Sequence, residues 1–182
     1  MPGYAYAQKT QAPVWAAMDS VFSPSFYKPY EAAVQTALFM LCDARERLAL
    51  ETGEDVRGIT FRLKDPASIR DKLIKKGLPV SPLTACAALH DIAGLRVVLG
   101  STAQVYRFAE ILQKSPLAQV TDERDYIARP KESGYRSLHL LFNVPVCLRT
   151  HVQMVPVEIQ LRTASMDIWA SIEHDICYKP KA

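Results

Sequence analysis

The stretch ITFRLKDPASIRDKLIKKG, residues 59–77, passes from a strand pattern to a helix pattern within a few residues. Apolar and polar side chains alternate over 59–64, which is typical of a strand with one buried face. Asp65 and Pro66 then provide a favourable helix cap and first helical residue, and Gly77 provides a stop. We therefore predict a β-strand that leads directly into an α-helix.

The chain before this stretch predicts one long helix and an irregular arm. Apolar residues recur at helical spacing at Tyr30, Val34, Leu38, Leu41 and Leu48. We expect the helix to run from near Pro29, which suits a first helical turn, to about Glu51, with Gly53 as its stop. Residues 1–24 mix Pro, Ala, Gly and aromatic residues without a period, so we interpret them as an irregular N-terminal arm.

The chain after this stretch alternates helices with strands and then becomes mostly strand. The predicted elements are a short helical turn at Ala85–His90, a strand at Leu95–Leu99, a helix capped by Ser101 or Thr102, strands at Gln119–Asp122, Leu138–Val144 and Val155–Leu161, and a last helix from near Thr163. This order predicts an α+β class, with a mixed β-sheet flanked by helices. We expect residues 25–182 to form a single domain.

Composition and cysteine usage exclude several classes of protein. The 182 residues suit one domain with a full core, and no window is long and apolar enough to span a bilayer. The N-terminus lacks the pattern of a secretory signal, and the four cysteines form no CxxC pair, which argues against a disulfide framework or a zinc site. We therefore expect a cytoplasmic protein without a membrane partner. The net charge of +3 is too small to argue for nucleic acid by itself.

Cationic side chains gather where the first predicted strand meets its helix. Ser68, Lys72 and Lys75 share one helix face, while Arg62 and Lys64 share one face of the strand. These groups converge near a helix N-terminus, where backbone N–H groups already favour anions. The geometry suits a polyphosphate, and the alternative interpretation is a solvated basic face.

The segment HDIAGLRVVL, residues 90–99, presents a carboxylate at the entrance of a strand. Asp91 and Gly94 stand just before the apolar run. An Asp in this position can bind Mg²⁺, which takes one or two carboxylates together with substrate phosphate oxygens. The alternative is a turn Asp followed by a Gly with positive φ.

Two further segments combine polar groups with aromatic rings or a buried strand. In DYIARPKESGYRSLHL, residues 125–140, cations and tyrosines crowd a loop, which is what a nucleotide base and its phosphates require. In VPVEIQLRT, residues 155–163, Glu158, Gln160 and Arg162 alternate with apolar residues and therefore share one strand face. The alternatives are ordinary packing for the loop and a half-exposed strand with solvated polar residues.

Taken together, these four segments resemble the synthetase domain of the RelA/SpoT-type alarmone synthetases. The matching stretches are RLKDPASIRDKLIK at 62–75, DIAGLR at 91–96, DYIARPKESGYRSLH at 125–139, and VEIQLRT at 157–163 with the MDIWASIEH that follows at 166–174. The resemblance runs from about residue 30 to the end, and in size the chain is similar to the small single-domain members. It implies a nucleotidyltransferase-like mixed sheet and transfer of pyrophosphate from ATP to the 3′-hydroxyl of GTP or GDP, giving (p)ppGpp and AMP.

The resemblance also implies a role for each matching residue. Asp91 and Glu158 are the expected catalytic carboxylates and the ligands of Mg²⁺, and Glu158 would also activate the acceptor hydroxyl. ATP would be bound by Arg62 and Arg96 around adenine, and by Lys64, Ser68, Lys72 and Lys75 on its phosphates. GTP or GDP would be bound by Tyr135 stacking on guanine, by Lys131 and His139 at the phosphates, and by Gln160, Asp167 and Glu173.

The sequence also departs from the family pattern. The chain stops at YKPKA soon after the last motif, whereas small members usually continue with helices that help to build an oligomer, so a homo-oligomer is left open. No HD-type metal motif is present, so we expect no hydrolase domain.

Two alternative functions are kept. One is the same chemistry on another acceptor, an adenine nucleotide or the 3′ end of tRNA. The other is a non-catalytic module that binds nucleotides or single-stranded RNA, and an RNA regulator is likewise left open. The sequence does not decide between GDP and GTP.

Overall fold

The computed structural model describes residues 21–178, and the greater part of the predicted N-terminal arm lies outside this range. In chain order the elements are α1 (Pro24–Thr52), β1 (Gly58–Leu63), α2 (Pro66–Lys75), α3 (Pro82–Ala88), β2 (Ala93–Leu99), α4 (Thr102–Gln113), β3 (Gln119–Asp125), β4 (Leu138–Cys147), β5 (Val152–Thr163) and α5 (Ala164–Tyr178). No helix among the described residues is both long and apolar enough to cross a membrane.

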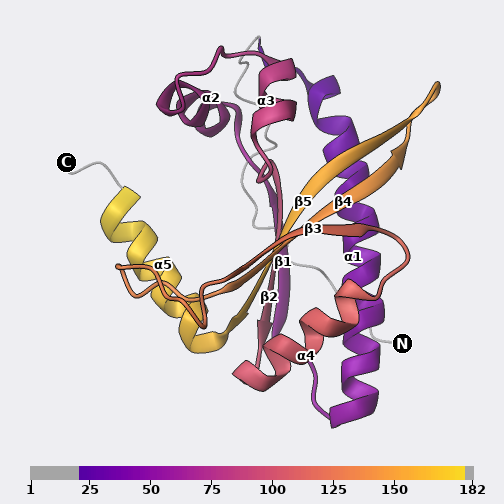
Figure 1. The fold of residues 1–182 in the computed structure, drawn as a ribbon, viewed down its shortest axis with the longest axis vertical. Coiled ribbons are helices and arrows are strands. Elements are labelled where there is room, and N and C mark those ends of the chain that lie inside the picture. Colours follow the sequence, from indigo (N-terminus) through magenta and orange to yellow (C-terminus); the bar gives the residue numbers. More distant parts are fainter. Residues whose placement is uncertain (1–20, 179–182) are drawn as a thin grey trace.

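The strands form one five-stranded mixed sheet in the order β1-β2-β5-β4-β3. Strands β2 and β5 pair in parallel at its centre, and the other neighbours are antiparallel. A mixed sheet flanked by helices was predicted from the sequence, and Figure 1 shows this arrangement with α1 and α4 beside the sheet.

Strand register divides the sheet into an apolar face and a polar face. Leu95, Ile159 and Leu140 lie side by side on β2, β5 and β4, and each is at most 2% exposed. Helix α1 contacts this sheet from β1 to β4, and α4 contacts β2 and β5. Since neighbouring residues of a strand point to opposite faces, the intervening polar residues of the same strands face away from this core. The polar face therefore carries the candidate site.

Apart from three extra residues at the end of β4 and at the start of β5, three elements differ from the prediction. Helix α1 begins at Pro24, behind the N-cap Ser23, and continues through Pro29, which the sequence had suggested as its start. Helix α3 begins directly after its N-cap Ser81, whose side chain accepts a hydrogen bond from Thr84 N–H. Its first residue, Pro82, therefore lies three residues before the predicted start.

The third difference is that β3 continues to Asp125, three residues beyond the predicted end, because it pairs with β4 over that whole length. Gly94 lies inside β2 instead of before it, and its φ is not positive, so the alternative interpretation of a turn glycine is wrong. The longer β3 places Arg124 opposite His139 of β4.

Candidate active site

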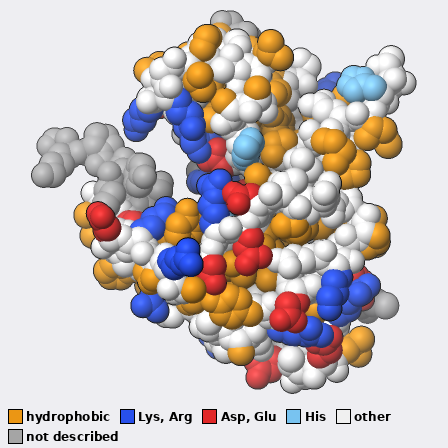
Figure 2. Space-filling model, viewed as in Figure 1, with side chains coloured by type: hydrophobic (Ala, Val, Ile, Leu, Met, Phe, Trp, Pro, Cys, Tyr) orange, Lys and Arg blue, Asp and Glu red, His pale blue; other side chains and the backbone are white. Residues whose placement is uncertain are grey.

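A pocket of ≈ 290 Å³ opens between α2 and α3 on one side and strands β3, β4 and β5 on the other. Its lining consists mainly of charged and polar side chains: Lys72, Lys76, Ala88, His90, Asp91, Asp122, Arg124, His139, Leu141 and Glu158. Figure 2 shows charges of both signs around a hollow in this face of the molecule. The structure therefore brings the two predicted catalytic carboxylates and one predicted phosphate-binding lysine into one pocket.

Asp91 lies between two ammonium groups. Its Oδ2 accepts hydrogen bonds from Lys64 Nζ at 3.0 Å and from Lys72 Nζ at 2.7 Å. Burial raises the pKa of Asp91, but the hydrogen bond from Lys72 and the charge of Lys64 outweigh it and hold the pKa below the usual value. Asp91 is therefore a carboxylate at neutral pH, and it ties the end of β1 to α2 through its two lysines.

The other oxygen of Asp91, Oδ1, is buried and has no hydrogen-bond partner among the described residues. A buried carboxylate oxygen without a donor fits a cation ligand, since such an orphaned acceptor is otherwise costly. Among the described residues there is no cluster of three or more acidic, His or Cys side chains suited to a metal. The residues present thus fit an ion held by one or two carboxylates and completed by substrate, as Mg²⁺ often is.

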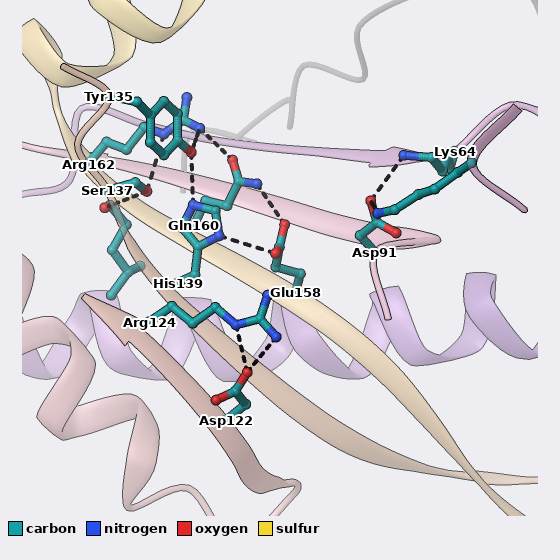
Figure 3. A network of polar contacts seen from close by, with 12 residues as sticks. Lys64, Asp91, Asp122, Arg124, Tyr135, Ser137, His139, Glu158, Gln160 and Arg162 are labelled. Atoms are coloured by element: carbon teal, nitrogen blue, oxygen red, sulfur yellow. Dashed lines mark hydrogen bonds and ion pairs between the residues drawn. The ribbon is translucent and has the colours of Figure 1, made fainter. Parts of the chain in front are cut away.

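Glu158 on β5 is held at both oxygens (Figure 3). Oε1 contacts His139 Nδ1 at 3.1 Å, and Oε2 accepts from Gln160 Nε2 at 2.7 Å. Burial raises the pKa of Glu158 and the nearby charge of Asp91 raises it further, but the contacts with His139 and Gln160 prevail and lower it below the usual value. Glu158 is therefore an ionised acceptor in a fixed orientation.

Gly94 lies between residues that were predicted to bind ATP and residues that were predicted to bind GTP or GDP. It pairs with Arg62 on β1 and with Glu158 on β5. A Cβ at Gly94 would meet only the Arg62 side chain, at 4.0 Å. In this row of three strands, β1 carries the cation of Arg62, β2 has no side chain at Gly94, and β5 carries the carboxylate of Glu158. Space for a ligand therefore remains above β2.

The loop between β3 and β4 places an aromatic group beside the carboxylate. Tyr135 Oη lies 2.8 Å from His139 Nε2, and the rings of Tyr126 and His139 meet edge to face with centroids 5.2 Å apart. Lys131 Nζ lies 4.6 Å from the centre of the Tyr135 ring. Tyr135 is only 7% exposed, and the guanidinium of Arg162 also lies near its ring, with Cζ 5.1 Å from the ring centre.

The same loop is anchored to α5. Gly134 has a φ of +80° and lies against the indole of Trp169, whose Nε1–H donates to Ser133 O at 3.2 Å. A side chain at Gly134 would be strained by its φ and would press on the indole. Trp169 therefore packs against the loop that carries Tyr135.

Asp167, in the first turn of α5, joins two guanidinium groups. Its Oδ1 contacts Arg96 Nη1 at 3.1 Å and Arg162 Nη1 at 3.2 Å. Burial and the neighbouring charge of Arg162 lower the pKa of Arg96. The predicted acceptor-side residue Asp167 thus contacts a predicted adenine-side residue, and the two sides meet at the start of α5.

Of the predicted residues, Lys72, Asp91, His139 and Glu158 line the pocket, and Lys64, Tyr135 and Gln160 contact members of that set, whereas Ser68, Lys75 and Glu173 are placed differently. The hydroxyl of Ser68 donates to Asp65 at 2.6 Å as part of the α2 cap. Lys75 is exposed and Glu173 is half-buried, and neither lines the pocket. Their proposed contacts with nucleotides remain predictions.

Several side chains of the site were not predicted from the sequence. Asp122 and Arg124 line the pocket and form an ion pair at 2.7 Å; Asp122 is the last residue of the predicted strand, and Arg124 lies beyond it. Lys76 follows α2 directly and also lines the pocket. A run of four cations between Arg70 and Lys76 was the available signal for Lys76, whereas Arg124 could be placed only by the pairing of β3 with β4.

The chain is similar to known proteins over the segments that form the site. Residues 61–182 match the family model described as a region found in RelA / SpoT proteins. The chain is 41% identical over 118 residues to GTP pyrophosphokinase YwaC of Bacillus subtilis, covering 65% of this chain and 56% of YwaC. It is 36% identical over 163 residues to GTP pyrophosphokinase YjbM of the same organism, covering 89% of this chain and 76% of YjbM.

A solved structure shares the architecture. Small alarmone synthetase 1 from Bacillus subtilis, bound to its product pppGpp, superimposes with a TM-score of 0.75 at 36% identity, covering 85% of this chain and 78% of that one. The same enzyme has also been solved with AMPCPP, and that structure gives a TM-score of 0.69 at 30% identity, covering 85% of this chain and 76% of that one. The α+β class predicted from the sequence is confirmed by these likenesses.

Proposed function

Because this chain belongs to the RelA/SpoT family, we propose that it is a GTP pyrophosphokinase, which moves pyrophosphate from ATP to the 3′-hydroxyl of GTP or GDP and releases AMP. The observation that carries the proposal is one pocket that holds Asp91 between two lysines and Glu158 between two polar partners. The names of its relatives and the pppGpp held by one of them support the same reaction.

ATP, the pyrophosphate donor, is expected to bind at the wall of the site that carries Lys64 and Lys72. Lys64 and Lys72 already surround one oxygen of Asp91, and they can share their remaining donors with the phosphates of ATP. Arg62 and Arg96 lie on the same sheet face of neighbouring strands, two residues apart in register, where they can flank adenine. Fixed cations at this wall stabilise the negative charge of the phosphates without further reorganisation.

Asp91 Oδ1 is the atom best suited to hold Mg²⁺, and Glu158 is the second carboxylate of the pocket. When bound, the ion supplies charge neutralisation and orientation at the phosphate oxygens.

The acceptor side is the loop that carries Tyr135. Guanine is expected to stack on its ring once Lys131, which is exposed and lies against that ring, swings toward the acceptor's phosphates. His139 lies between Tyr135 and Glu158, so an acceptor on the ring places its sugar near the carboxylate. Tyr135 thereby determines where the acceptor hydroxyl lies.

The chemical step then needs one proton acceptor and one stabilised leaving group. Glu158 takes the proton from the 3′-hydroxyl, and the freed oxygen attacks the β-phosphorus of ATP. The bond between the β-phosphorus and the oxygen that joins it to AMP breaks, and AMP leaves with that bonding pair. Lys72, on the pocket wall, neutralises charge that develops on the phosphates.

The experiment that tests the proposal is incubation with ATP, Mg²⁺ and one acceptor at a time, followed by identification of every nucleotide product. The acceptors are GDP, GTP, ADP and deacylated tRNA. We expect AMP in equal amount to a pyrophosphorylated guanine nucleotide. Product formed only with ADP or tRNA would move the acceptor to another class, and ATP left intact with all four would leave a binding module.

The expected substrates are cytoplasmic nucleotides, so we place the reaction in the cytoplasm. A homo-oligomer and a single-stranded RNA regulator stay predictions. Light scattering on the purified chain tests the first, and salt-dependent binding of single-stranded RNA tests the second.

A further inference from the structure

Arg162 on β5 is a buried cation with four polar partners. It is 3% exposed and is not among the residues that line the pocket. Its guanidinium donates to Tyr135 Oη at 2.5 Å, Gln160 Oε1 at 2.7 Å, Asp167 Oδ1 at 3.2 Å and Ser137 Oγ at 3.3 Å. Buried ion pairs are often no more stabilising than apolar packing, so stability alone does not account for this arrangement.

The first path from Arg162 to Glu158 has a fixed direction (Figure 3). A guanidinium can only donate, so the Tyr135 oxygen accepts from Arg162 and its own hydrogen is left for His139 Nε2. At the other end of this path the ionised Glu158 can only accept, so His139 Nδ1 carries a hydrogen and donates it to Glu158 Oε1. In a neutral imidazole Nε2 is then the accepting nitrogen, and it takes the hydrogen of Tyr135.

The second path reaches the other oxygen. The same Arg162 nitrogen, Nη2, donates to Gln160 Oε1, which settles which end of that amide is oxygen. The amide nitrogen of Gln160 then points to Glu158 Oε2 and donates to it. Two hydrogen-bond paths that begin at one nitrogen therefore end on the two oxygens of one carboxylate.

We infer that Arg162 is a positioning residue for the transfer proposed above: it holds the ring of Tyr135, which receives the acceptor, and the carboxylate of Glu158, which faces the acceptor hydroxyl, in one mutual orientation. The inference rests on the proposed function. It assigns Arg162 no contact with substrate, and its effect passes entirely through Tyr135, His139 and Gln160. Orientation of this kind matters because a displacement of about 1 Å can cost about 100-fold in rate.

Two substitutions break the paths at different points. Arg162→Met removes the donor of both paths and keeps a long apolar side chain, while Asp167 keeps its contact with Arg96. Tyr135→Phe removes only the hydroxyl of the first path and keeps the ring for stacking. Ser137→Ala is the matched control, because it removes a partner of the same guanidinium that leads to neither oxygen of Glu158.

The measurement is kcat and KM for ATP and for the guanine nucleotide, with each variant first shown to be folded. We expect kcat to fall about 10- to 100-fold in Arg162→Met and less in Tyr135→Phe, with KM for ATP within about threefold of wild type. The double variant should be no slower than Arg162→Met, because that change has already broken both paths. Ser137→Ala should keep kcat within about threefold of wild type.

Several results would overturn the inference. They are a folded Arg162→Met variant with wild-type kcat, losses in the two single variants that multiply in the double variant, or an equal slowing by Ser137→Ala. If Arg162→Met does not fold, Tyr135→Phe decides alone, and an unchanged kcat refutes the first path. A wild-type protein that forms no AMP would instead remove the proposed function itself.

Discussion

Replacing Glu158 by Gln is the change that bears most directly on the proposed chemistry. The amide keeps the size of the side chain but cannot take a proton at neutral pH. Loss of a general base costs about 10² to 10⁴ in rate, which is about 2.7 to 5.4 kcal/mol of activation free energy at 1.36 kcal/mol per tenfold change. We expect kcat to fall within that range while ATP affinity is kept, because Glu158 lies on the acceptor's side of the pocket.

The structure also predicts a separate effect of this substitution on stability. Glu158 accepts at both oxygens, from His139 and from Gln160, whereas an amide can accept at only one end. One hydrogen bond to a charged group is lost, which costs about 1.5 to 3 kcal/mol of unfolding free energy. Denaturant unfolding of the variant measures this loss independently of turnover.

The assay is AMP release at saturating guanine nucleotide, with ATP affinity measured by calorimetry using a non-hydrolysable analogue. Glu123→Gln is the matched control, since Glu123 is an exposed carboxylate on strand β3 of the same sheet and does not line the pocket. It should turn over at the wild-type rate. Turnover of Glu158→Gln within tenfold of wild type, or a loss that lies wholly in ATP binding, would refute the role of this carboxylate.

Three further predictions follow from the same contacts. Asp91→Asn should abolish most activity and leave Lys64 and Lys72 without their shared carboxylate, and titration with Mg²⁺ should restore only part of the rate; full restoration would show that Asp91 merely tunes metal affinity. Tyr135→Ala should raise KM for the guanine nucleotide about 5- to 150-fold, the equivalent of about 1 to 3 kcal/mol of stacking, with KM for ATP unchanged; a larger defect for ATP would contradict the assignment. The pKa values of Asp91 and Glu158 are lowered in the folded protein, so both carboxylates stabilise the fold at pH values above their usual pKa values of 3.8 and 4.5. This stabilisation is lost as the pH falls through the lower pKa values of the folded state. The melting temperature should therefore decline on acidification below about pH 5, and a constant melting temperature down to pH 3 would contradict this.

The family and the fold class could be predicted from the sequence because their signals are local. Alternation over 59–64 and 155–161 identified two strands of the sheet, and motif residues spaced along the chain identified the RelA/SpoT family, which the comparisons confirm. The register of the sheet, which the sequence alone does not give, then brings Arg62, Gly94 and Glu158 side by side. The roles of the individual residues stay predictions.

What could not be predicted depends on tertiary packing. The end of β3, ERD at 123–125, has no apolar alternation and becomes part of the strand only by pairing with β4, so Arg124 was missed. Arg162 occupies a position that strand alternation assigns to a solvated face, yet the Tyr135 loop and the first turn of α5 bury it. No single-strand pattern contains that information.

The most direct test of the account is the fate of a label on the β-phosphate of ATP in a reaction with GDP. Wild-type protein should place the label on the guanine nucleotide while unlabelled AMP accumulates in equal amount, and the Asp91→Asn and Glu158→Gln variants should show little or no transfer. Labelled ADP as the product, or transfer at the wild-type rate in both variants, would contradict the claim that the two carboxylates of this pocket serve one attack on the β-phosphorus.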